Sequence, residues 1–228
     1  MIRLHCVVEG QTEEAFVNSV LADHLGWVNV FANVRCVETS RQPARIFRGG
    51  GRHYEKIKKD LVLWMKEDQQ PEAFFTTMFD VYGLPGDFPG LNSPHQPTAP
   101  YQRVAFLERE FADDIAHRQF IPYLQLHEFE ALLLADPAKF AARFIEHTTG
   151  IQALIEECAR YSSPELIDDG ETTAPSKRII DRIADYKGSK HSAGPLIAKQ
   201  IGLPTIRQKC PHFDGWLVKL ESLSQRPS

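Results

Sequence analysis

Carboxylates recur at or near the carboxyl ends of three predicted strands, where a parallel sheet would bring them together. They are Glu9 after the first strand, Asp80 at the end of the third with Asp87 after it, and Glu128 and Glu130 at the end of the fourth. Ligands in open α/β sheets bind beyond the carboxyl ends of the strands, so we expect these side chains to meet there. Oxygen ligands without paired His or Cys suit Mg²⁺ or Mn²⁺, and such ions stabilise the attacking and leaving oxygens in phosphodiester cleavage. All five are therefore candidate metal ligands, with Glu9 and Asp80 also catalytic candidates and Asp87 a reserve ligand.

The alternative for each acid is an ordinary solvated charge. A lone acid after a strand is more often a loop residue, and that interpretation stays open for Glu9 taken by itself. Recurrence at three strand ends favours a site. If the fourth strand continues, Glu128 and Glu130 also point to one side, because residues i and i+2 of a strand share a face. The segment HEFE lacks the HExxH spacing of zinc proteases, so zinc hydrolysis is not expected.

Six cations are candidates for contacting phosphate or nucleic acid. They are Arg48, Arg52, Lys177, Arg178, Lys187 and Lys190. The first two flank a run of three glycines before a predicted helix, an arrangement that can expose backbone N–H groups to an anion. Lys177 and Arg178 begin a helix, where cations oppose the helix dipole, so helix stability does not explain them. We expect this pair to screen a reacting phosphate, with Lys177 a catalytic candidate. A flexible linker for the first pair and simple solvation for the second remain open.

The elements that must position these residues follow from apolar patterns. Strands are predicted within residues 4–8, 28–38, 73–82 and 120–129, with helices between them. From residue 137 the strand pattern disappears and helical patterns follow, with Leu196 among the expected core residues. The fold prediction is a Rossmann-like α/β domain over residues 1–136, with a mostly parallel four-stranded sheet. Residues 137–228 are predicted to be an α-helical region packed on it.

Bulk composition narrows the class of protein. The chain has 228 residues, 43% of them hydrophobic and 25% charged, which is ordinary for a globular protein. A net charge of -4 gives no overall attraction to nucleic acid, so any such binding must use local basic patches. The chain begins almost at once with a strand and has no apolar run long enough to span a bilayer. A cytoplasmic protein is therefore expected.

Several motifs carry a resemblance to known families. The turn VEGQTEE at residues 8–14, the strand ending in Asp80 and the segment HEFEALL resemble the Toprim domain of topoisomerases, primases and overcoming-lysogenization-defect nucleases. Together with LPGDFPG, PELIDDG, APSKRI and CPHFDGWL, they resemble the bacterial domain-of-unknown-function family 4276 over nearly the whole chain. The resemblance implies a Toprim-like fold. Members of that family are often paired with an ATPase in phage-defence loci, which implies a nuclease effector acting on nucleic acid, DNA being the expected substrate.

The resemblance also implies roles for individual residues. Glu9 matches the Toprim glutamate and Asp80 the first aspartate of the DxD motif. The second motif position is Tyr82, so Asp87, Glu128 or Glu130 would have to supply the missing ligand. One alternative is a non-catalytic regulatory subunit that binds an ATPase partner. Another is a phosphoacceptor domain using Asp80, but the paired acids and late lysine that such a domain needs are not found.

Overall fold

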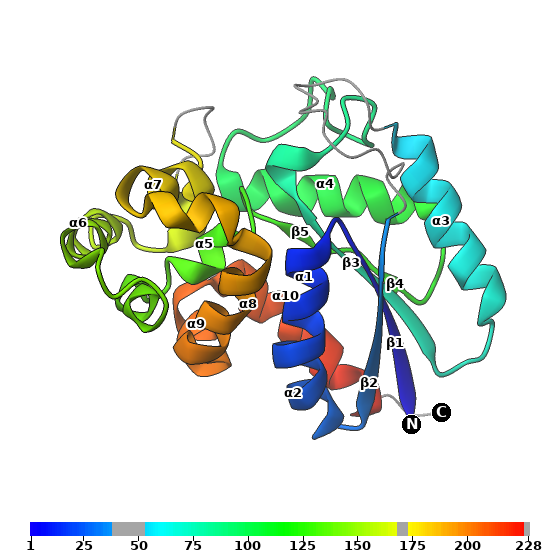
Figure 1. Ribbon diagram of the computed structural model, residues 1–228. Coiled ribbons are helices and arrows are strands. Elements are labelled where there is room, and N and C mark those ends of the chain that lie inside the picture. Colours follow the sequence, from blue (N-terminus) through cyan, green and yellow to red (C-terminus); the bar gives the residue numbers. More distant parts are fainter. Residues whose placement is uncertain (38–52, 168–172, 226–228) are drawn as a thin grey trace.

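A parallel sheet lies at the centre of the molecule (Figure 1). The structure is a computed structural model that describes residues 1–37, 53–167 and 173–225. Its five strands run in the order β2-β1-β3-β4, with β5 also paired to β3, and every pairing is parallel. The strands are β1 (Ile2–Val8), β2 (Val30–Cys36), β3 (Ala73–Asp80), β4 (Phe120–Ile121) and β5 (Leu124–Gln125). The predicted mostly parallel α/β fold is confirmed.

The predicted fourth strand is wrong in its length. Residues 120–129 form two short strands, β4 and β5, because Pro122 stands between them and has no N–H for the ladder. A side chain of β3 bonds to the backbone here, with Thr76 Oγ1 donating to the carbonyl oxygen of Ile121 at 2.6 Å. Beyond β5 the chain turns, and His127 adopts a left-handed backbone with φ of 64°. The segment that carries Glu128 is therefore a turn and not a strand.

Helices cover both faces of the sheet (Figure 1). The helices of the first half are α1 (Gln11–Phe16), the π-helical η1 (Val17–Leu21), α2 (Ala22–Gly26), α3 (Tyr54–Glu67), the 3-10 helix η2 (Val81–Gly83) and α4 (Pro100–Ile115). Strand side chains alternate between faces, so Val7 packs with α3 and α4 while Cys6 and Val8 pack with α1 and α2. This alternation gives each face of the sheet its own apolar cluster.

Beyond residue 136 the described part of the chain contains helices and no strand. The elements from Glu130 onward are α5 (Glu130–Leu133), η3 (Pro137–Ala142), α6 (Thr148–Cys158), η4 (Pro164–Leu166), α7 (Pro175–Arg182), η5 (Ala184–Gly188), α8 (Lys190–Ile201), α9 (Leu203–Lys209), α10 (Pro211–Glu221) and η6 (Ser222–Gln225). Helix α8 lies beside α1 (Figure 1), and Trp216 of α10 donates to Thr76 Oγ1 in β3 at 2.9 Å. One apolar cluster thus joins both halves. Leu196 is an exception, because its side chain is exposed and the prediction that it belongs to the core is wrong. In the described ranges no helix has the length and apolar character to cross a bilayer.

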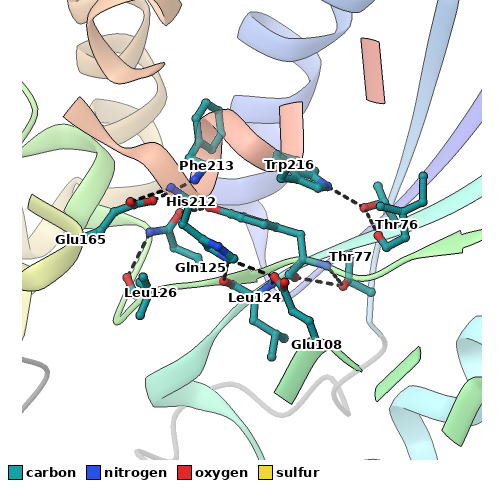
Figure 2. Close-up of polar contacts among 12 residues, drawn as sticks. Thr76, Thr77, Glu108, Leu124, Gln125, Leu126, Glu165, His212, Phe213 and Trp216 are labelled. Atoms are coloured by element: carbon teal, nitrogen blue, oxygen red, sulfur yellow. Dashed lines mark hydrogen bonds and ion pairs between the residues drawn. The ribbon is translucent and has the colours of Figure 1, made fainter. Parts of the chain in front are cut away.

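A buried polar network ties α10 to the end of the sheet (Figure 2). The carboxylate of Glu165 accepts hydrogen bonds from the backbone N–H groups of His212 at 3.0 Å and Phe213 at 2.9 Å, at the start of α10. The Nε2 atom of His212 lies 3.0 Å from Glu108 Oε1 and 3.2 Å from the carbonyl oxygen of Leu124 in β5. These contacts hold η4 and the start of α10 against the end of β5.

Candidate active site

The pairing of β1 with β3 brings Glu9 and Asp80 together. The register sets Val8 opposite Met78, so Glu9, one residue beyond β1, reaches the level at which β3 ends in Asp80. The turn after Asp80 lies against the Glu9 carboxylate. A Cβ atom added at Gly83 would stand 2.9 Å from Glu9 Oε2, so glycine there leaves room for this side chain. The predicted meeting of these two acids is found.

Asp80 has the most perturbed environment in this group of acids. Its Oδ1 atom is buried and has no hydrogen-bond partner among the described residues. Burial raises the pKa of Asp80 well above its ordinary value, and the negative charges of Glu9, Glu13, Glu130 and Glu128 raise it further. We call these five acids the acidic cluster.

Glu128 and Glu130 belong to the cluster, but they do not reach it from one face of a fourth strand as predicted. Because the strand has already ended, they do not share a strand face. Glu130 is the first residue of α5 and is buried, whereas Glu128 precedes the helix and is half-buried. The Glu128 Oε2 atom accepts a hydrogen bond from the backbone N–H of Ser176 at 2.8 Å, in the first turn of α7. A carboxylate is favourable there because the positive end of the helix dipole faces it.

Partners from the C-terminal helices hold Glu130. Lys190 Nζ lies 3.2 Å from Glu130 Oε1, and the hydroxyl of Tyr186 donates to the same oxygen at 3.3 Å. Burial raises the pKa of Glu130 and the charge of Lys190 opposes that rise. Lys190, predicted as a phosphate contact, therefore lies within the cluster.

Glu13 is a member that the sequence predictions missed. It lies in the first turn of α1, is 8% exposed, and contributes to the raised pKa of Asp80. In the sequence it was noted only as part of the turn VEGQTEE. The available signal was its spacing, since Glu13 follows Glu9 by four residues across a turn through Gly10.

Asp87 lies outside the cluster. Its Oδ1 atom accepts the backbone N–H of Tyr54 at 3.0 Å, and its Oδ2 atom lies 3.6 Å from His53 Nδ1. The bond from Tyr54 is the main reason that the pKa of Asp87 is lowered. Asp87 caps the start of α3, so the geometry gives it a structural role in place of the expected role as reserve ligand.

The other predicted cations divide into three groups. The guanidinium of Arg178 pairs with Glu157 and also donates to the carbonyl oxygen of Thr173 at 2.6 Å, which ties α7 to α6 and leaves it poorly placed to bind phosphate. Lys177 and Lys187 are exposed. The predicted contacts at residues 48 and 52 (Arg48 and Arg52) lie outside the described residues.

The donor set of the cluster fits a hard divalent cation. All donors are carboxylate oxygens, and one buried oxygen of Asp80 is without a hydrogen-bond partner in the described ranges. No three or more His, Cys, Asp or Glu side chains among the described residues already surround one point as metal ligands. Binding a cation would therefore require side-chain rotation.

Fold and site together define a parallel α/β protein with an acidic cluster at the carboxyl edge of its sheet. The chain belongs to the family described as a domain of unknown function (DUF4276), whose model matches residues 8–221. That span includes every member of the acidic cluster. No curated protein matches the chain, and no solved structure matches it.

Proposed function

We propose that this protein hydrolyses phosphodiester bonds in nucleic acid with Mg²⁺ or Mn²⁺ held by Glu9, Asp80, Glu128 and Glu130. The observation that supports the proposal is the gathering of four other carboxylates around Asp80, whose Oδ1 atom is buried without a hydrogen-bond partner among the described residues. Gathering like charges around a partly buried acid lowers stability, so a purely structural role does not account for it. A bound divalent cation would offset that cost.

Different residues of the chain would hold the cation, position its ligands and contact the phosphate. When bound, the cation polarises a phosphoryl oxygen and lowers the pKa of a water molecule, so no protein nucleophile is needed. Glu9 and Asp80 anchor the site from adjacent strands. Lys190 keeps Glu130 in place and brings positive charge to the cluster. Lys177 follows Ser176, whose N–H binds Glu128, so this exposed lysine would approach the phosphate from the edge of the site.

The biological setting follows from the family resemblance. The protein would act in the cytoplasm on DNA as the effector of a phage-defence system and work with an ATPase encoded nearby. The net charge of -4 makes a partner useful, because the chain itself has no overall attraction for a polyanion.

The decisive experiment compares Asp80→Asn with Asp113→Asn. Asp113 is an exposed aspartate on α4 and supplies the matched control. Both proteins are incubated with plasmid and single-stranded DNA in magnesium, manganese or chelator, alone and with the ATPase. We expect cleavage by wild type and Asp113→Asn only with metal, and a loss of at least about 100-fold in Asp80→Asn. Equal cleavage by Asp80→Asn and wild type would contradict the assigned site.

A regulatory subunit is the second candidate. Two observations favour it: Tyr82 stands at the second acidic position of the motif, and the described acids are not already arranged around a cation. In that case wild type cleaves nothing even with its partner, and the chain changes the ATPase rate of that partner.

A further inference from the structure

A cavity of about 260 Å³ lies near the acidic cluster, at the same strand ends. Val81 and His127 line it, and these residues are the chain neighbours of Asp80 and Glu128. Because Val81 packs with α4, a ligand in the cavity would lie close to the cluster, on the side of the strand ends that α4 covers. Arg103, Val104, Leu126 and Leu166 also line the cavity.

Hydrogen bonds drawn in Figure 2 fix two residues that line the cavity, Leu126 directly and Leu166 through its neighbour Glu165. The amide Nε2 of Gln125 donates to the carbonyl oxygen of Leu126 at 3.0 Å, and the Tyr123 hydroxyl holds Gln125 at 2.7 Å. Leu166 follows Glu165, whose carboxylate is fixed by the start of α10. The apolar side of the cavity is thus part of the rigid fold, as a preformed binding site requires.

Hydrogen bonds also fix the polar side of the cavity. Arg103 Nε donates to Gln96 Oε1 at 3.1 Å, and Gln96 is itself bonded to the carbonyl oxygens of Gly90 and Leu91. This is the only side-chain hydrogen bond of Arg103 among the described residues, so both terminal NH₂ groups remain able to donate. An arginine presenting two donors suits a planar partner with two acceptors.

Size and chemistry together indicate the ligand. The volume is below the roughly 300–1,000 Å³ that holds drug-sized ligands, so the cavity suits one ring system and not a whole nucleotide. Apolar walls from Val104, Leu126 and Leu166 favour a flat apolar face, while Arg103 can bond to acceptors on its edge. A nucleobase has both features.

We propose that this cavity receives an unpaired nucleobase of the nucleic-acid substrate, near the phosphodiester that is hydrolysed at the acidic cluster. The inference rests on the proposed function and adds a substrate class to it. A base inside a duplex cannot enter such a cavity, so the substrate is single-stranded or has its base turned out of the helix. Arg103 is a specificity residue in this arrangement.

The test measures binding of an eight-nucleotide single strand and of an abasic strand of the same length and charge. Fluorescence anisotropy is used with Asp80→Asn and magnesium, so that the strands remain intact. We expect the abasic strand to bind about tenfold more weakly or worse, because stacking and edge bonds are lost. In that background, Leu166→Trp fills the cavity and should remove the difference, whereas Leu63→Trp, at an exposed leucine of α3, should not.

A second pair of variants guards against a folding defect in Leu166→Trp. Arg103→Gln should weaken binding of the intact strand about tenfold and leave the abasic strand unchanged. Arg109→Gln, at an exposed arginine of the same helix, is the control.

Three outcomes would overturn the inference. If both strands bind equally while wild type cleaves DNA, the cavity does not hold a base and the proposed function stands. If neither strand binds and wild type does not cleave, both proposals fail. If a free nucleoside monophosphate competes while the abasic strand binds as well as the intact strand, the cavity receives the base of a free nucleotide and not a base of the nucleic-acid substrate.

Discussion

Replacing Gly83 by alanine tests the position of Glu9 without removing any carboxylate. The added Cβ atom would stand 2.9 Å from Glu9 Oε2 and 3.0 Å from Oε1. Ordinary contact begins near 3.4 Å, so the carboxylate must move by about 0.5 Å. Misplacing a reacting group by about 1 Å can reduce the rate about 100-fold, so we expect cleavage to fall about ten- to 100-fold.

Stability should change little in Gly83→Ala. The atoms displaced are the end of a flexible side chain, and the backbone of Gly83 has no positive φ. Loss of unfolded-state entropy even favours alanine by about 0.4–1 kcal/mol. The melting temperature should therefore stay within about 4 °C of wild type.

The assay compares kcat/KM for single-stranded DNA in Gly83→Ala and Gly86→Ala. Gly86 lies three residues away on the same loop, and a Cβ atom there would meet nothing within 4 Å. It should cleave like wild type. Equal rates for the two variants, with both folded, would refute the placement of Glu9 at the reacting centre.

Two further predictions concern stability. Without metal at neutral pH, Asp80→Asn should melt at a higher temperature than wild type, because ionising Asp80 in the cluster lowers stability. Because the pKa of Asp80 is raised in the folded state, the stability that Asp80 contributes is fully present below the unfolded-state value of about 4 and is lost as the pH rises through the folded-state pKa. The free energy of unfolding, measured by denaturant titration at increasing pH, should therefore fall more for wild type than for Asp80→Asn. Parallel pH dependences of the two proteins would contradict the role of the cluster. Glu165→Leu leaves two backbone N–H groups at the start of α10 without their acceptor, so it should lower the free energy of unfolding by about 2–6 kcal/mol. Glu55→Leu, at an exposed glutamate of α3, should change it by less than about 0.5 kcal/mol in the same denaturation assay, and a similar loss in both variants would contradict the role of the network.

The sequence was sufficient for the central strands and for the pair of acids at their carboxyl ends. Strands β1 and β3 are rich in apolar residues, so their ends, and with them Glu9 and Asp80, could be predicted from pattern alone. The sequence pattern did not reveal which hydrogen bonds and packing contacts each of the other acids makes. Asp87 accepts a hydrogen bond from the backbone at the start of α3, and the two bonded residues are 33 positions apart in the sequence. Glu13 is buried on α1, which packs against α8, a helix far away in the sequence.

The helical region supplies contacts that the cluster needs, which explains why its acids can coexist before any cation binds. Glu128 receives the N–H of Ser176, and Glu130 receives Lys190 and Tyr186, all from residues beyond 136. Without these partners, two more unscreened carboxylates would face Asp80, and their repulsion would add to the burial that already raises its pKa. The sheet thus fixes where the acids meet, and the helices reduce the cost of holding them there. The acidic cluster therefore depends on both halves of the chain.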